Sequence, residues 1–195
     1  LTYIKVKMIK IGITGSIASG KTTASEIISK KKGPLFNADK VVKNLYQIKS
    51  FKNKVARKLN IKLNLKFKKE LKNKILKNKN DLKKIEKLIH PLVRKQMYKF
   101  IKLNKSKKYI FLEVPLLIEN KLNKHFDVII FIKSNTKIRL KRFQKKGGSK
   151  KLFNLLNNHQ LKDDIKAKFS DHIVVNNKSL PVLKKKLSNI IKFYE

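Results

Sequence analysis

Short apolar runs recur along the chain and predict the strands of a buried sheet. They cover residues 9–14, 35–38, 109–114, 127–132 and 172–175. Runs that are apolar at nearly every position are typical of parallel strands, because such strands are buried on both faces. Since helical patterns separate the runs, we expect an α/β fold in which helices flank a parallel five-stranded sheet in three layers.

Apolar residues at helical spacing predict the helices between these strands. Ala24 and Ile28 share one side of a helix expected over residues 21–32. Two more helices are expected over residues 135–146 and 180–194. Together with the first strands, the helix at 21–32 makes the opening of the chain a β-loop-α-β unit, whose crossover is right-handed.

The domain organisation follows from where the strand patterns stop and return. One domain is expected over residues 8–195, with a core at 8–45 and 109–195 and a helical subdomain at about 46–108. Within this subdomain Pro91 predicts the start of a new helix over 91–104, because proline suits the first helical position. Residues 1–7 add no pattern that the fold needs, so we expect a non-native or disordered extension before Met8.

The formal charge of +39 changes this picture less than its size suggests. Of the 51 basic residues only four are arginine, and the bias toward lysine, asparagine, isoleucine and phenylalanine runs along the whole chain. A genome rich in A and T produces such a bias everywhere, whereas nucleic-acid recognition favours arginines gathered on one face. The charge would still attract acidic small molecules such as nucleotides.

Other classes of protein are disfavoured by what the sequence lacks. With no cysteine, disulfides and thiolate metal sites are excluded, and the four histidines are scattered without ligand spacing. No apolar run approaches the roughly 20 residues needed to cross a bilayer. We therefore expect a cytoplasmic protein without a membrane partner, acting as a monomer, although the sequence leaves oligomers open.

A phosphate-binding motif lies between the first predicted strand and the first predicted helix. The stretch GSIASGKT at residues 15–22 matches G-x-x-x-x-G-K-[ST], a loop whose backbone N–H groups surround phosphates at a helix N-terminus. Lys21 is expected to reach the β- and γ-phosphates of ATP, and the Thr22 hydroxyl to coordinate Mg²⁺. The ATP-binding residues expected here are Gly15, Ser16, Ala18, Ser19, Gly20, Lys21, Thr22 and Thr23.

Asp39 is the candidate catalytic base. It follows the second predicted strand, and the carboxyl ends of parallel strands face one crevice, which brings Asp39 toward the γ-phosphate. An aspartate there can accept a hydroxyl proton during phosphoryl transfer. Its alternative role is to cap the helix that follows, which is compatible with the first.

Several segments in this order resemble the dephospho-coenzyme A kinase family of P-loop kinases. They read GITGSIASGKTT at 12–23, NAD at 37–39, LIHPLVR at 88–94, EVPLLIEN at 113–120, LKRFQKKGG at 140–148 and HQLKDDIKAKFSDHIVVNN at 159–177. The resemblance implies transfer of the ATP γ-phosphoryl group to the ribose 3′-hydroxyl of dephospho-coenzyme A, with Asp39 as the base. The products of this reaction are coenzyme A and ADP. The resemblance thus implies the last step of coenzyme A biosynthesis.

The resemblance also implies a substrate side and a lid. Substrate contacts are expected at Asp39, His90, Arg94, Pro115, Leu116 and Glu119. A lid at about 142–162 would bring Arg142 and Lys146 over the phosphates, where positive charge stabilises the transferred group. Arg142 is thus expected to act in catalysis beside Lys21.

Two residues depart from the family pattern. Asn37 stands where the family has aspartate, which leaves Asp39 to act alone, and Lys146 stands where arginine is usual. Lysine is a point charge without the planar fork of arginine. Both departures are expected to affect the rate more than the type of reaction.

Two other functions stay open from the sequence. The first is a P-loop kinase for another small acceptor, such as a nucleoside monophosphate. The second is a basic nucleic-acid-binding protein with a vestigial phosphate loop, whose binding would depend steeply on salt.

Overall fold

The computed structural model describes residues 7–195, which form two compact units. One unit contains the chain up to Asn37 and Phe100–Glu195, and the other contains Ala38–Lys99. Of the extension expected at 1–7, all but Lys7 lies outside the described residues.

The bounds of the helical unit differ from the 46–108 expected from the sequence. Leu45 and Tyr46 pack against the core of the helical unit, so the chain joins this unit directly after the second strand. At the other end the ring of Phe100 lies 5.6 Å from that of Phe36, which assigns Phe100 to the sheet unit. The sequence pattern of a segment does not show which residues pack against it, so these bounds could not be predicted from the pattern.

Five parallel strands form the sheet of the first unit. They are β1 (Ile9–Gly15), β2 (Leu35–Asn37), β3 (Tyr109–Glu113), β4 (Val128–Lys133) and β5 (His172–Val175), in the order β2-β3-β1-β4-β5. All four pairings are parallel, with Ile9 beside Tyr109 and Ile11 beside Val128. The predicted parallel five-stranded sheet is confirmed, and its carboxyl ends lie at one edge.

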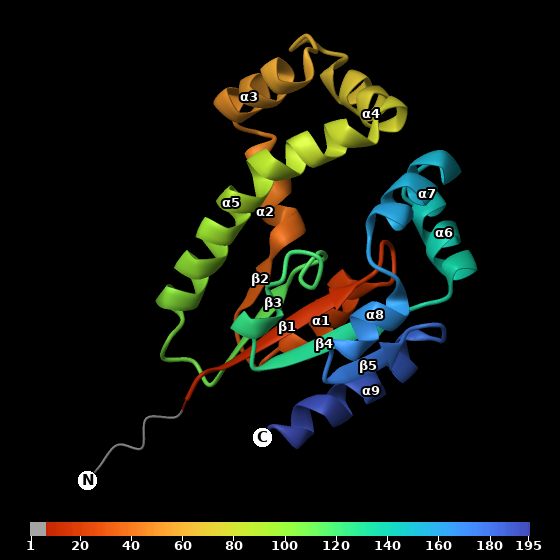
Figure 1. The fold of residues 1–195 in the computed structure, drawn as a ribbon. Coiled ribbons are helices and arrows are strands. Elements are labelled where there is room, and N and C mark those ends of the chain that lie inside the picture. Colours follow the sequence, from red (N-terminus) through yellow and green to blue (C-terminus); the bar gives the residue numbers. More distant parts are fainter. Residues whose placement is uncertain (1–6) are drawn as a thin grey trace. The chain divides into compact units, whose positions relative to one another are not determined.

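Two helices cover one face of this sheet, as Figure 1 shows. They are α1 (Lys21–Ser29) and α9 (Leu180–Phe193). Ala24 and Ile28 of α1 and Leu187 of α9 pack with alternate strand residues such as Ile13 and Ile130. This buried apolar core fixes the start of α1 at the end of β1.

The opposite face is covered by the loop after β3, which includes η1 (Asn123–His125), and by α8 (Asp163–Lys168), which contacts β4. The helices α6 (Thr136–Lys145) and α7 (Lys150–His159) pack against each other beyond the carboxyl ends of the strands, as Figure 1 shows. The loop packs so closely that a Cβ added to Gly12 would lie 2.8 Å from atoms of Leu117 and Phe126. The sheet unit therefore has three layers, as predicted.

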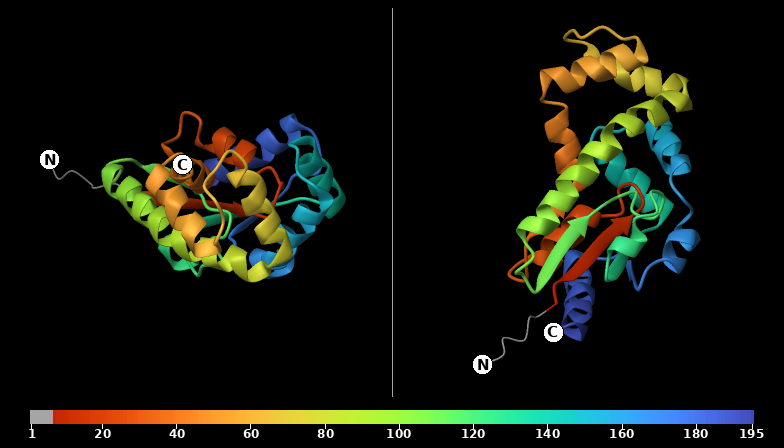
Figure 2. Two further views of the ribbon diagram at one scale, coloured as in Figure 1. Left: turned by 90° about the horizontal axis from the view of Figure 1, so that it is seen from above. Right: turned by 60° about the vertical axis from the view of Figure 1, so that its left-hand side comes forward.

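Helices alone make up the second unit, and they can be followed in Figure 2. They are α2 (Ala38–Leu45), α3 (Lys49–Leu59), α4 (Phe67–Lys77) and α5 (Lys79–Leu103), whose last turn belongs to the sheet unit. The predicted break at Pro91 is wrong, because α5 runs through it. A proline removes one helical hydrogen bond, and the turns on either side continue despite that cost. Although α5 has 25 residues, no helix among residues 7–195 is long and apolar enough to span a membrane.

Candidate active site

Two glycines shape the phosphate loop between β1 and α1. Gly20 has a φ of 95°, which favours glycine, and a Cβ there would collide with the Asn176 amide. A Cβ on Gly15 would lie 2.5 Å from the carbonyl oxygen of Ile132. Side chains at either position would therefore displace the walls of the loop.

The loop turns its carbonyl groups toward the protein. Lys21 Nζ donates to Ser16 O at 3.2 Å, and Arg139 donates to Ile17 O at 3.4 Å. Ser19 O accepts from Arg142 Nη1 at 3.2 Å and from Asn176 Nδ2 at 2.9 Å.

Ser19 adds a buried polar group to the loop. Its hydroxyl is fully buried and makes no hydrogen bond with any described residue. Carbonyls that are bonded to protein side chains and an unsatisfied hydroxyl fit a loop that binds an anion such as phosphate.

Glu113, at the end of β3, lies beside the first turn of α1. Its carboxylate is fully buried and accepts from Thr22 Oγ1 at 2.7 Å, Ser25 Oγ at 2.9 Å and Asn37 Nδ2 at 2.5 Å. Glu113 was not among the carboxylates expected at the site from the sequence, which were Asp39 and Glu119. An acidic residue at the end of an otherwise apolar strand run was the available signal.

Thr22 and Glu113 fit the partial coordination shell that Mg²⁺ finds in kinases. Magnesium keeps several waters and takes one or two protein oxygens together with substrate phosphates. Within residues 7–195 no group of three or more His, Asp or Glu side chains could hold a metal ion. The Thr22 hydroxyl and the Glu113 carboxylate beside the phosphate loop are suited to a magnesium site in which substrate phosphates and water supply the other ligands.

Two arginines of α6 contact the loop. Arg142, which the sequence analysis singled out, donates to Ser19 O and, through Nη2, to Asn176 O at 3.1 Å. Arg139, which it missed, is 4% exposed and also donates to Asn157 Oδ1 of α7 at 2.8 Å. Burial lowers the pKa of the Arg139 guanidinium, while the charge of Asp163 raises it.

The helices α6 and α7, which include the expected lid, enclose an aromatic contact of their own. The rings of Phe143 and Phe153 lie 5.7 Å apart, and the Arg139 guanidinium lies 5.7 Å from the Phe153 ring. Lys146, the other expected lid residue, is exposed at the end of α6. Only Arg142 of the two is placed against the phosphate loop.

The expected substrate residues after β3 make contacts within the sheet unit. Pro115 O accepts from Thr14 Oγ1 at 3.1 Å, and Leu116 O accepts from Asn120 Nδ2 at 2.8 Å. The Glu119 carboxylate accepts from the backbone N–H of Leu161 at 3.1 Å.

The remaining expected residues belong to the helical unit. Asp39 is exposed in the first turn of α2, two residues after Asn37. His90 is half-buried and Arg94 exposed on α5, and their spacing puts them on the same side of that helix. Their contacts with a substrate stay a prediction.

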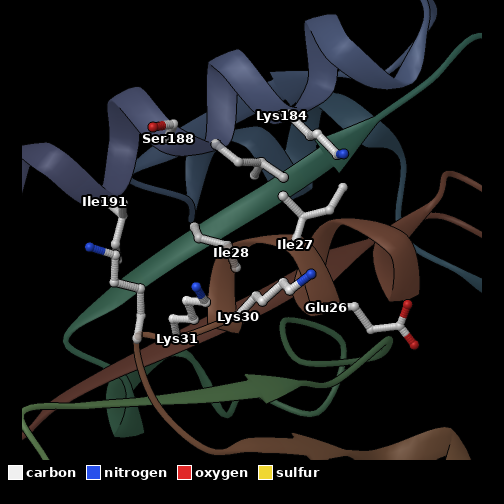
Figure 3. A pocket seen from close by; sticks show the side chains of 10 residues that line it. Glu26, Ile27, Ile28, Lys30, Lys31, Lys184, Ser188 and Ile191 are labelled. Atoms are coloured by element: carbon white, nitrogen blue, oxygen red, sulfur yellow. The ribbon is translucent and has the colours of Figure 1, made fainter.

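A groove of about 560 Å³ lies away from the phosphate loop, between the second half of α1 and α9 (Figure 3). Ile27, Ile28, Leu187 and Ile191 supply its apolar lining, and four lysines lie among its other lining residues. None of residues 15–22 lines it.

Comparison with known proteins identifies one family over nearly the whole chain. The model of the family described as dephospho-CoA kinase matches residues 9–181. A dephospho-CoA kinase of Fusobacterium nucleatum is 32% identical over 182 residues, which cover 91% of this chain and 94% of that protein.

Solved structures share the fold. Dephospho-CoA kinase from Campylobacter jejuni matches with a TM-score of 0.62 and 25% identity over 96% of this chain and 97% of that one. The protein TT1252 from Thermus thermophilus matches with a TM-score of 0.76 and 22% identity over 97% and 99%. These matches confirm the predicted P-loop kinase fold. The chain belongs to the dephospho-CoA kinase family.

Proposed function

We propose that this protein transfers the γ-phosphoryl group of ATP to the ribose 3′-hydroxyl of dephospho-coenzyme A, giving coenzyme A and ADP. The observation that carries the proposal is the phosphate loop, with its carbonyls bonded to protein side chains and the Glu113 carboxylate beside Thr22. In a chain of this family, that arrangement supports the family's reaction.

The bonds change as follows in the proposed reaction. The acceptor hydroxyl oxygen forms a bond to the γ-phosphorus as its proton passes to the Asp39 carboxylate. The bond between the γ-phosphorus and the bridging oxygen to the β-phosphate breaks, and ADP leaves with that oxygen. Phosphoryl transfer of this kind depends chiefly on positioning and on stabilising charge.

The cations of the sheet unit supply the charge in this scheme. Lys21 is held with its ammonium against the loop, from which it reaches the β- and γ-phosphates when ATP binds. Arg142 already contacts the loop carbonyl of Ser19, so a small change in its side chain directs it to the transferred group. Lys146 adds a further positive charge from the end of α6.

Thr22 and Glu113 are the residues that would hold Mg²⁺ with the phosphates. When bound there, Mg²⁺ would neutralise charge that develops on the phosphate oxygens. Glu113 orients the Thr22 hydroxyl by accepting a hydrogen bond from it. In this way Glu113 takes over the supporting role that Asn37 cannot perform.

The acceptor side of the proposal rests on the family resemblance. Asp39 follows Asn37 by two residues, and the Asn37 amide is fixed to Glu113. His90 and Arg94 would bind the acceptor from α5, and Pro115 and Leu116 would line its site. We expect the enzyme to act in the cytoplasm as a monomer, without a membrane or nucleic-acid partner.

Release of ADP with and without dephospho-coenzyme A tests the function. We expect the acceptor to raise ADP release strongly, and Asp39→Asn to lower kcat by about 10²- to 10⁴-fold because the proton acceptor is lost. The exposed Glu26 supplies a control, since Glu26→Gln makes the same change from carboxylate to amide outside the phosphate loop.

Three outcomes would contradict parts of the proposal. ADP release that does not respond to the acceptor removes dephospho-coenzyme A as the substrate, and a panel of nucleoside monophosphates would then test the other kinase function. Unchanged turnover of Asp39→Asn removes the base. Tight, salt-sensitive nucleic-acid binding without any ADP release would favour the vestigial-loop function.

A further inference from the structure

A segment outside the phosphate loop binds its first half. This segment, residues 160–166, contains the link between α7 and α8 and the first four residues of α8, and is called the strap below. Gln160 Oε1 accepts from the backbone N–H of Ile17 at 2.8 Å, and Asp163 Oδ1 accepts from Ser16 Oγ at 2.5 Å. Two strap side chains therefore hold two consecutive residues of the loop.

The strap is itself fastened to Glu119. One carboxylate oxygen, Oε1, accepts from Leu161 N at 3.1 Å and lies 2.7 Å from Lys166 Nζ. Lys166 is fully buried, and the Glu119 side chain is 14% exposed. A single carboxylate thus binds both ends of the strap.

The charge of Lys166 makes this contact necessary. A lysine is rarely buried completely, and removing its ionic partner leaves an uncompensated charge in a site of low polarity. Lys166 Nζ makes no well-formed hydrogen bond with any described residue, so the attraction to Glu119 is chiefly ionic.

Glu119 is in turn tied to the strand that carries the phosphate loop. Glu119 lies in the loop after β3, and in that loop Pro115 O accepts a hydrogen bond from the buried hydroxyl of Thr14, the residue before Gly15. The contacts form a closed circuit that runs from Thr14 through Pro115, Glu119 and the strap back to Ser16. A change at Glu119 or Lys166 must therefore alter the support of the phosphate loop.

We propose that Glu119 and Lys166 are positioning residues for ATP, which fix the strap and through it the phosphate-binding conformation of Ser16 and Ile17. In this role Glu119 acts on the nucleotide side of the reaction instead of contacting the acceptor. The inference rests on the proposed function only in that the loop binds ATP.

Direct titration with ATP in the absence of acceptor tests this proposal. We expect Lys166→Met and Glu119→Gln each to raise the dissociation constant of ATP about tenfold, a typical coupling between linked sites. At saturating ATP, the KM of dephospho-coenzyme A should not change. The control is Lys168→Met, which removes an exposed lysine of the same helix and should leave ATP binding unchanged.

Gln160→Met keeps the test decisive if the ion-pair variants fail to fold. It leaves Glu119 and Lys166 intact and removes only the bond to Ile17 N–H, so it should also weaken ATP binding. Hydrogen exchange of the Ile17 amide should become faster in Gln160→Met and in Lys166→Met. This second measurement reports the loop directly and needs no turnover.

Two results would overturn the inference. In the first, Glu119→Gln raises the KM of the acceptor while ATP binds as in the parent protein, which makes Glu119 a substrate contact. In the second, folded Gln160→Met and Lys166→Met bind ATP normally. A parent protein that binds no ATP would contradict the proposed function instead, so the two failures are distinguishable.

Discussion

Glu113 links the sheet to the phosphate loop through one buried carboxylate. Its three hydrogen-bond donors come from Thr22 and Ser25 of α1 and from Asn37 at the end of β2. A residue that orients a metal-binding group in this way affects catalysis without touching the reacting atoms. This single side chain therefore connects β2, β3 and α1.

Substitution of Glu113 by glutamine should lower activity more than stability. The amide keeps the size of the side chain but removes the charge that supports Thr22 and Mg²⁺, so we expect kcat to fall about 10- to 100-fold. The Mg²⁺ concentration for half-maximal rate should rise in the same assay. Glu26→Gln, an exposed change on α1, is the control, and equal rates for both variants would contradict the role of Glu113.

Restoring aspartate at position 37 should make the protein depend more on magnesium. In Asn37→Asp the donor to Glu113 is lost and two carboxylates meet, which repel each other without a cation. We expect a lower melting temperature in the absence of nucleotide and a larger increase on adding Mg²⁺ and ATP than in the parent. If the melting temperature of Asn37→Asp equals that of the parent under both conditions, the side chains at positions 37 and 113 do not interact.

The turn between α6 and α7 depends on close packing. A Cβ added to Gly148 would collide with the ring of Phe143, which packs against Phe153. Gly147 differs, because it has a φ of 81° and nothing within 4 Å of an added Cβ. The two adjacent glycines are therefore required for different reasons.

Gly148→Ala should destabilise the protein by about 1–3 kcal/mol, the range for overpacking. Gly147→Ala adds only left-handed backbone strain, which costs about 1–2 kcal/mol. Denaturant unfolding measures both values, with Lys145→Ala at an exposed position of α6 as the control.

Because Phe143 follows Arg142, Gly148→Ala should also lower kcat. If Gly147→Ala alone affects kcat, the aromatic contact does not position the lid.

The sequence predicted the five strands and the helices α1, α6 and α9 closely because their signals are local, but it did not predict α7 and α8. The strand at 172–175 matches β5, and the helix at 180–194 differs from α9 by one residue. The predicted break at Pro91 failed because a local proline signal competes with the helical turns around it. Propensity is a weak predictor when neighbouring turns are well packed.

The candidate site was predictable only in part. The motif at residues 15–22 is contiguous in sequence, so it located the turn between β1 and α1, while ATP binding by these residues stays a prediction. Arg139 and Lys166 depend on partners far away in the chain, at Ile17 and Glu119, and no spacing rule relates them. In a chain with 51 lysines and arginines, a functional cation also has no distinctive sequence signal.

The charge of +39 acts on the molecule as a whole. Like charges repel in the folded state, and the same field attracts ATP. Salt should therefore have opposite effects on stability and on nucleotide affinity.

Raising sodium chloride from about 20 to 300 mM shortens the range of these interactions several-fold. We expect the melting temperature to increase over this range and the dissociation constant of ATP to rise with it. Thermal unfolding and calorimetric titration in the same buffers provide the measurements. If both quantities stay constant, the excess of lysine has no electrostatic effect at this scale.

The strand order has a consequence for how the chain folds. The central strand β1 pairs with β3 and β4, which come much later in the chain. Ile9 can pair with Tyr109, and Ile11 with Val128, only after those residues have been synthesised. During synthesis, the helical segment between them leaves the ribosome first, and its mostly local contacts allow it to form early. Until β3 emerges, the apolar strand β1 has no neighbour on either side, which makes the nascent chain vulnerable to aggregation at that stage.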